Sequence, residues 1–125
     1  MNLQLNLFDN ITVFKMTGRI DSHSVHKLRQ QLALTAEHQG ATIILDLGGV
    51  DFIDSSGLAA IVHGMKQCRA NGGDLRLCRL HQSVRMVLEL TRLDKALDIF
   101  PTQESALQSF ATTAAVTAKA YASLG

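Results

Sequence analysis

The sequence predicts an α/β fold in which a mixed central sheet of four or five strands packs against about four helices. Apolar runs of strand length alternate with stretches of helical spacing along most of the 125 residues. One run, Thr42–Leu47, is so apolar that we expect a central strand with both faces covered. The first two strands are separated only by Asp9 and Asn10, which predicts an antiparallel hairpin. Later strands are joined through helices, so right-handed crossovers should make them parallel.

The first third of the chain supplies this hairpin and a helix. Apolar and polar residues alternate over residues 3–8, and a β pattern resumes over residues 11–16. Asp21 and Ser22 are candidate N-caps of a helix that runs to about Gln39. Its apolar positions recur at helical spacing, at Val25, Leu28, Leu32 and Ala36.

The remaining elements follow the central strand. A second helix is predicted over Ser55–Ala70, because its apolar residues form one stripe and Asn71-Gly72-Gly73 stops it. After it we expect, in chain order, a strand over residues 74–79, a helix from His81 or Ser83, a short strand near residues 97–100 and a last helix opened by Pro101-Thr102.

Length and composition fit a single domain, assigned to residues 1–111 and followed by an Ala- and Thr-rich tail or helix extension over residues 112–125. Hydrophobic residues make up 46% of the chain and charged residues 18%, which argues against disorder. The net charge is +1 without a basic run, so nucleic acid binding is not expected. Cys68 and Cys78 are expected to be buried free thiols.

The chain shows neither a signal peptide nor an apolar stretch of about 18 residues, so we expect a cytoplasmic protein without direct membrane contact. The sequence motifs GxxxxGK, GxSxG and HExxH are missing, and we therefore expect no enzyme, no catalytic residue and no cofactor. His23 and His26 have no clear third ligand, so no metal site is predicted.

The segment Asp54-Ser55-Ser56-Gly57-Leu58 connects the central strand to the second helix. A hydroxyl at a helix N-terminus lies where backbone N–H groups are unpaired and the helix dipole favours negative charge, so it can carry a phosphate. Nearby carboxylates, together with Gly48 and Gly49, indicate an exposed loop. These residues suggest that Ser55 is a phosphorylation site, and the structural alternative is that it only caps the helix.

Two longer stretches give the motif a family context. Ile44–Val62, ILDLGGVDFIDSSGLAAIV, followed by the Asn71-Gly72-Gly73 turn and the LRLCRL strand, resembles a STAS domain, the module shared by sulfate transporters and anti-sigma factor antagonists. Thr17-Gly18-Arg19-Ile20-Asp21 is similar to the Thr-Gly-x-hydrophobic-Asp segment of that family. The resemblance covers about residues 3–107 and implies the STAS fold.

The resemblance also implies a function. Ser55, the first serine after Asp54, would be the phosphoacceptor of an anti-sigma factor antagonist. Its partners would be an anti-sigma factor that is also a serine kinase, and a metal-dependent PP2C-type phosphatase. The unphosphorylated antagonist would bind the kinase and release the sigma factor, until phosphorylation ends that binding. We expect the partner to contact Asp21, Asp54, Ser56 and Gly57.

Several alternatives stay open at this point. Ser56 competes with Ser55 as acceptor, although a step of about 100° along the helix turns the two hydroxyls apart. Asp21 has a second reading as a simple cap of the first helix. Within the STAS family, the chain could be a subunit of a transport or stress-signalling complex. An alternative from another class of protein is a receiver domain, which would be phosphorylated on Asp46 after a buried strand segment. The chain, however, lacks the adjacent acidic pair with which a receiver holds magnesium.

Overall fold

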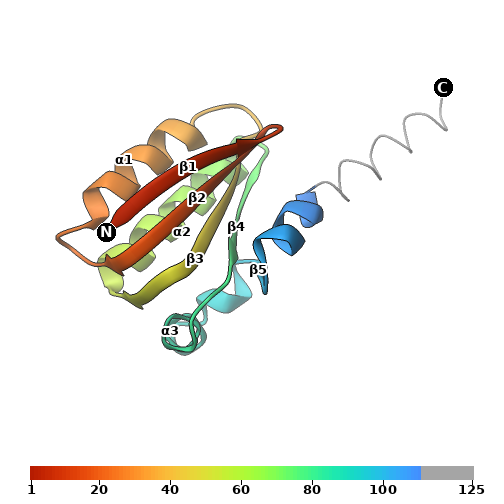
Figure 1. Ribbon diagram of the computed structural model, residues 1–125. Helices are drawn as coiled ribbons and strands as arrows, with labels where there is room; N and C mark the ends of the chain where they lie inside the picture. Colours follow the sequence, from red (N-terminus) through yellow and green to blue (C-terminus); the bar gives the residue numbers. More distant parts are fainter. Residues whose placement is uncertain (111–125) are drawn as a thin grey trace, which may run out of the picture.

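The structure, a computed structural model of this chain, describes residues 1–110. One five-stranded sheet has the order β1-β2-β3-β4-β5, with β1 antiparallel to β2 and all later neighbours parallel (Figure 1). The strands are β1 (Asn2–Phe8), β2 (Ile11–Ile20), β3 (Thr42–Ile53), β4 (Asp74–Cys78) and β5 (Ile99–Phe100). The predicted mixed sheet is therefore confirmed.

The helices match the sequence pattern in number and order. They are α1 (Val25–Ala36), α2 (Ser55–Ala70) and α3 (Gln82–Leu90), followed by the short 3-10 helix η1 (Leu93–Lys95) and a helical stretch over residues 103–110. The bounds predicted for α2 are confirmed at both ends. The predicted domain end at residue 111 and the tail over residues 112–125 lie outside the described residues.

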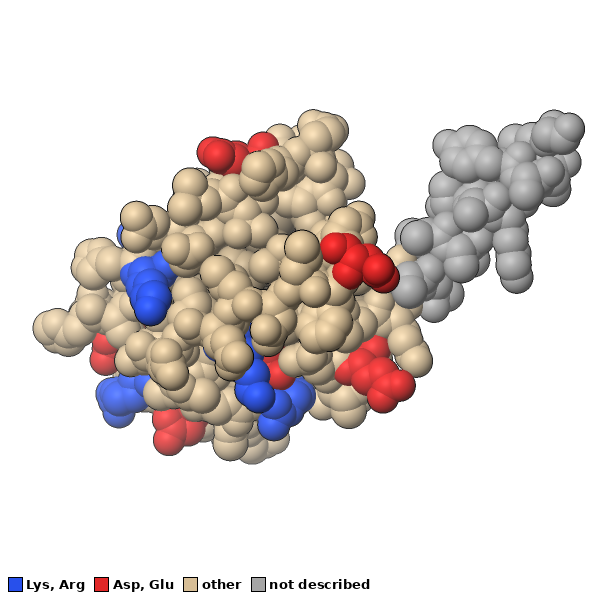
Figure 2. All heavy atoms as spheres, turned by 45° about the horizontal axis from the view of Figure 1, so that its top comes forward, with Lys and Arg blue, Asp and Glu red and all other residues tan. Residues whose placement is uncertain are grey.

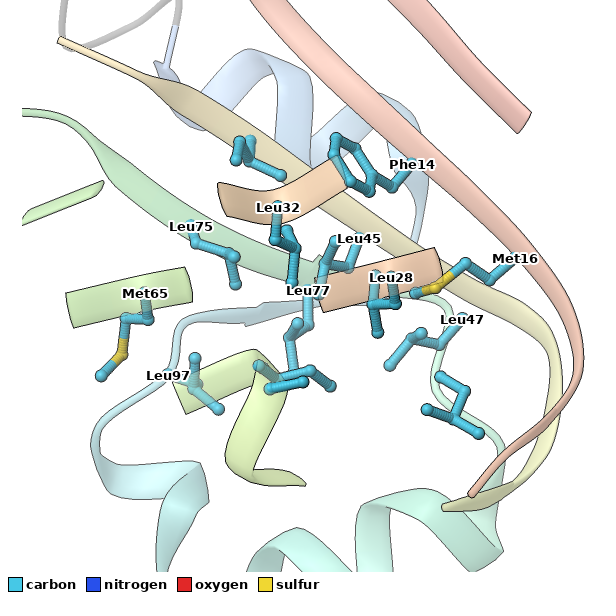
Figure 3. Close-up of a cluster of buried hydrophobic side chains, with 14 of the residues drawn as sticks. Phe14, Met16, Leu28, Leu32, Leu45, Leu47, Met65, Leu75, Leu77 and Leu97 are labelled. Carbon is cyan, nitrogen blue, oxygen red and sulfur yellow. The ribbon is translucent and has the colours of Figure 1, made fainter. Parts of the chain in front are cut away.

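The main core lies between the sheet and the helices α1 and α2, which run side by side on one face of it (Figure 1). Leu45 of β3 pairs with Phe14 of β2 and with Leu77 of β4, and all three side chains are fully buried. Figure 3 shows how these side chains and those of α1 and α2 interdigitate. Burying a leucine of this kind stabilises the fold by about 1.5–3 kcal/mol.

On the other face of the sheet, residues 103–110 cover part of β2, β3 and β4. Ala106 of this helical stretch is fully buried in a second cluster with Val13 of β2 and Ile44 of β3. Phe110 lies under the Arg76 guanidinium of β4, 3.8 Å from it to the ring centroid. Because α1 and α2 cover its opposite face, β3 has the two-sided burial that its apolar sequence predicts.

Two predicted boundaries are wrong. The helix α1 begins at Val25 and ends at Ala36, so neither Asp21 nor Ser22 is its N-cap. The Asp21 carboxylate instead accepts the N–H groups of His23 and Ser24, which closes a turn before the helix starts. At the other end, the helix stops three residues before Gln39.

The central strand β3 is also longer than predicted, and continues through Gly48 and Gly49 to Ile53. Residues 17–20 of β2 extend the parallel pairing along it, past two shifts of register. A Cβ added to Gly49 would lie 2.9 Å from the Met16 carbonyl oxygen, so the glycine permits the close approach of the two strands. The glycines therefore keep the strand paired and do not end it.

Candidate functional site

Ser55 is the first residue of α2 and is exposed to solvent. Its hydroxyl makes no hydrogen bond with any described residue. Ile53, two residues earlier, is buried and fixes the end of β3 to the core. The helix N-terminus therefore presents the Ser55 hydroxyl at the carboxyl edge of the parallel strands, where an external molecule can reach it.

Asp54 caps α2, and Ser55 does not. The Asp54 Oδ1 atom accepts the Ser56 N–H at 2.9 Å and the Gly57 N–H at 3.1 Å. The Ser56 hydroxyl also donates to Oδ1 and is half-buried. The helix-cap alternative for Ser55 is therefore wrong, and the competing acceptor Ser56 has its hydroxyl engaged.

Asp54 also joins the start of α2 to the loop that precedes α1. Its Oδ2 atom accepts the Ser22 N–H at 3.2 Å, and its own N–H donates to the Ile20 carbonyl at 3.1 Å. Asp21 is therefore brought next to the Ser55 segment, although Asp21 and Asp54 lie 33 positions apart in the sequence. Asp21 has the local role of closing the turn before α1 and also lies beside the candidate site.

Gly57 is buried where the first turn of α2 approaches the end of β2. A Cβ at this position would lie 2.8 Å from the Ile20 side chain and 2.7 Å from the Ile53 side chain. The packing of the first turn of α2 against the sheet therefore requires glycine at this position. This packing fixes the position of Ser55, two residues earlier, relative to the edge of the sheet.

Arg19 and Phe52 form a contact beside Asp21 that the sequence does not reveal directly. The Arg19 guanidinium carbon lies 3.9 Å from the centroid of the Phe52 ring, and Arg19 Nε lies 3.7 Å from Asp21 Oδ2. Phe52 is 37% exposed and Ile53 is buried, so Ile53 anchors this segment to the core and the Phe52 ring stays accessible. The register that pairs Arg19 with Phe52 is the signal that would have found this contact.

A groove of about 500 Å³ lies between α1 and α2. Ala59, one turn after Ser55, and His63, one turn further, line it from α2. Arg29 and Ala33 line it from α1. The exposed hydroxyl is thus adjacent to a concave surface with small apolar walls and basic edges.

Both aspartates at the site are held in their charged form. Hydrogen bonds, the Ser56 hydroxyl first among them, lower the pKa of Asp54 below its ordinary value of 3.8 and outweigh partial desolvation. For Asp21, partial burial by itself would raise the pKa, but hydrogen bonds from Ser24 and His23 outweigh it and the net shift is downward. Asp54 thus already satisfies two N–H groups at the start of α2, so a phosphate on Ser55 would point outward beside a carboxylate.

These shifts predict a specific loss of stability in acid. A carboxyl group whose pKa is lower in the folded than in the unfolded protein stabilises the fold fully above 3.8 and loses that contribution as the pH falls through the folded value. The substitution Asp54→Asn is therefore expected to flatten the fall of unfolding free energy with pH below 3.8, measured by urea denaturation at a series of pH values.

The matched control is Asp51→Asn, because Asp51 is exposed near the end of β3, three positions before Asp54, and its carboxylate makes no hydrogen bond with a described residue. It should keep the wild-type pH dependence. An Asp54→Asn protein with the wild-type slope would contradict the capping role of Asp54.

Asp46, the acceptor in the receiver-domain alternative, is only 1% exposed. Its carboxylate accepts hydrogen bonds from Arg79 Nη1 at 3.2 Å, from Gln103 Nε2 at 2.9 Å and from the Gly48 N–H at 3.0 Å. A small phosphodonor cannot reach an oxygen enclosed in this way. The hairpin at the start of the sheet likewise departs from the regular βα alternation of a receiver.

Other expected features can be compared with residues 1–110. Cys68 and Cys78 are buried and free, as predicted, and burial raises the pKa of the Cys68 thiol to about 11 and that of Cys78 to about 12.

Within residues 1–110 no group of three His, Cys, Asp or Glu side chains is arranged to hold a metal ion. No described helix is both long and apolar enough to span a membrane. On the face that Figure 2 shows, basic and acidic side chains are scattered and form no patch of a single sign.

Comparison with known proteins identifies relatives over almost the whole described chain. The family model of the STAS domain matches residues 2–106. The chain is 31% identical to an anti-sigma-B factor antagonist of Bacillus subtilis over 108 residues, which are 86% of this chain and 98% of that protein. The solved structure of the anti-sigma factor antagonist SpoIIAA in its unphosphorylated form has a TM-score of 0.76 at 25% identity, covering 89% of this chain and 97% of that one. The phosphorylated form of Bacillus SpoIIAA has a TM-score of 0.69 at 25% identity, covering 87% of this chain and 99% of that one.

Proposed function

Because the chain belongs to the STAS domain family, we propose that it is an anti-sigma factor antagonist whose binding is switched off by phosphorylation of Ser55. The observation that carries the proposal is the exposed Ser55 hydroxyl, which has no hydrogen-bond partner among residues 1–110, beside Ser56, whose hydroxyl is hydrogen-bonded to Asp54. That a related antagonist is known in unphosphorylated and phosphorylated forms supports it.

The proposed partner is an anti-sigma factor that is also a serine kinase, and a PP2C-type phosphatase restores the unmodified antagonist. The proposed partner surface comprises Ser55 with the neighbouring residues Asp21, Asp54 and Ser56 at the carboxyl edge of the sheet. Gly57, which the sequence also assigned to partner contact, is buried and supports this surface from beneath. The backbone and side chains here are held by the Asp54 hydrogen bonds and by the close packing at Gly57, so the partner meets a preformed surface.

The switch acts through charge at the interface. A phosphoserine adds about −1.5 to −2 charges at neutral pH. Within the free protein this charge stays in solvent next to Asp54, so it neither orders nor unfolds α2 to any large extent. Under a partner, the same charge would be buried without a counter-charge, at a cost of about 3–5 kcal/mol. That cost removes the partner without a change of fold.

Phosphopeptide mapping tests the assignment. The protein is incubated with ATP and an extract of its own cells, digested and analysed by mass spectrometry, with Ser55→Ala as the matched substrate. We expect the phosphate on Ser55 in the natural sequence and no comparable modification in Ser55→Ala. Phosphate on Ser56 or at another position, with Ser55 unmodified, would remove the assignment.

Co-purification separates this function from the other role considered within the family. An antagonist should retain a kinase-fold protein, and the amount retained should fall after phosphorylation. A subunit of a transport complex should instead retain membrane proteins, and that result would contradict the antagonist role.

A further inference from the structure

Among residues 1–110 no strand pairs with the outer edge of β1, and this edge lacks the features that normally protect an edge strand. β1 is the first strand of the sheet and pairs on one side only, with β2 (Figure 1). Its sequence, NLQLNLF, contains no charged residue and no proline over seven positions. Edge strands of monomeric proteins usually carry lysine, proline or a bulge that prevents pairing with another chain. This edge is therefore open to pairing with a further strand.

The core-side face of β1 is apolar and incompletely covered. Leu3, Leu5 and Leu7 point to the same face as α1, because they pair with Met16, Phe14 and Thr12 of β2. Leu3 packs against the main core, but Leu5 is 42% exposed and Leu7 is 71% exposed. A row of leucines thus continues from the core to the edge of the sheet, where no described element covers its end.

The hairpin geometry sets which backbone groups face outward. The turn residues Asp9 and Asn10 make Phe8 and Ile11 the closing pair, which in a two-residue turn exchanges backbone hydrogen bonds. Along an antiparallel ladder this role alternates, so the N–H and C=O groups of Leu3, Leu5 and Leu7 point away from β2. Leu5 and Leu7, whose side chains are exposed, therefore also supply outward-facing backbone donors and acceptors.

We infer that two copies of this chain associate through antiparallel pairing of β1 with β1, which makes one continuous ten-stranded sheet across a two-fold axis at Leu5. In this register Leu5 lies opposite Leu5 of the second copy, and Leu3 lies opposite Leu7. Leucines then meet on one face, and on the other face Gln4 lies opposite Asn6 and Asn2 lies opposite Phe8. No like charges are placed opposite each other, because the strand is uncharged.

The size of the contact sets its strength. Seven extended residues span about 23 Å, so the strand pair gives an interface at the low end of specific complexes, below about 1,200 Å² in total. The expected dimer is therefore reversible and concentration-dependent. It leaves Ser55 free, because Ser55 follows the carboxyl end of β3 whereas Leu5 lies at the middle of β1. Dimerisation should accordingly be the same in Ser55→Asp, so its test is independent of the proposed function.

Sedimentation velocity over about 5 to 500 µM protein tests the association. We expect the natural sequence to shift from monomer to dimer over this range. Leu5→Lys places two like charges opposite each other at the axis and also removes the apolar contact of the two leucines, so it should raise the dissociation constant at least about tenfold. Leu34→Lys is the matched control, because Leu34 is 51% exposed but lies on α1, and it should leave the dissociation constant unchanged.

Cross-linking tests the register independently of stability. A hydrogen-bonded antiparallel pair has Cα atoms about 5.5 Å apart, which is within the range that a disulfide bridges. Leu5→Cys is expected to form a disulfide-linked dimer under mild oxidation, whereas Leu34→Cys is not. A natural-sequence protein that stays monomeric at the highest concentration, a dimer that Leu5→Lys does not weaken, or equal cross-linking of the two cysteine variants would overturn the inference.

Discussion

Phosphorylation of Ser55 is expected to weaken binding to the proposed kinase partner by about two to three and a half powers of ten. The estimate follows from the cost of burying an uncompensated charge, about 3–5 kcal/mol, at about 1.4 kcal/mol per factor of ten. Ser55→Asp carries less charge than a phosphoserine and should lie at the lower end, with a loss of about a hundredfold. Calorimetric titration of the purified kinase with each form measures the effect.

Two control proteins separate this effect from a general effect of charge. Ser55→Ala should bind about as well as the unmodified protein, because it removes only a hydroxyl without a hydrogen-bond partner in the described chain. Gln39→Asp adds the same charge at an exposed position before β3, at the opposite end of the strand from Ser55, and should also bind normally. Equal affinities of Ser55→Asp and Ser55→Ala would contradict the electrostatic switch.

Asp46→Ala is expected to lower the free energy of unfolding by about 2–4 kcal/mol. The substitution would leave the Gly48 N–H and the Gln103 amide without their acceptor beneath the last helical stretch. It would also leave Arg79 without its counter-ion. Arg79 has a left-handed backbone, with φ of 60°, and its guanidinium lies against Gly48, where any Cβ would clash with it. The carboxylate thus holds three segments together, and urea denaturation measures the loss.

Asp51→Ala is the control for this substitution. Asp51 lies on the same strand, but its side chain is exposed and makes no hydrogen bond with the described residues. Its unfolding free energy should stay within about 0.5 kcal/mol of the natural protein. An Asp46→Ala protein that is as stable as Asp51→Ala would show that the buried carboxylate contributes nothing to the fold.

The sequence predicted the elements of this fold closely wherever local signals were strong. Both ends of α2 could be predicted, because its apolar stripe follows Asp54 and is stopped by Asn71-Gly72-Gly73. The Asp9-Asn10 turn gave the hairpin, and the apolar run in β3 gave a strand covered on both faces. Errors arose at Asp21, which closes a turn with His23 and does not cap α1, and at Gly48, where pairing with the distant strand β2 overrode the local preference for a loop.

The candidate site likewise contains residues that a local motif predicts and contacts that depend on the tertiary structure. Ser55, Asp54 and Gly57 belong to one short motif, so the sequence could identify them together. The contact of Arg19 with Phe52 depends on the register between β2 and β3, and the bond from Ser22 to Asp54 depends on two loops meeting at one edge of the sheet. Neither follows from the spacing of residues along the chain.

The sequence alone determined the succession of strands and helices along the chain, the family resemblance and the serine at the start of α2. Periodicity and short motifs are local properties of the chain, so they can be read without the structure. Only the tertiary structure decided that Asp54 takes up the N–H groups and leaves the Ser55 hydroxyl free, and that Asp46 is sealed under the last helical stretch. It also left the leucine row of β1 uncovered. The physical reason is that burial and hydrogen-bond partners are set by segments that meet in space from distant parts of the sequence.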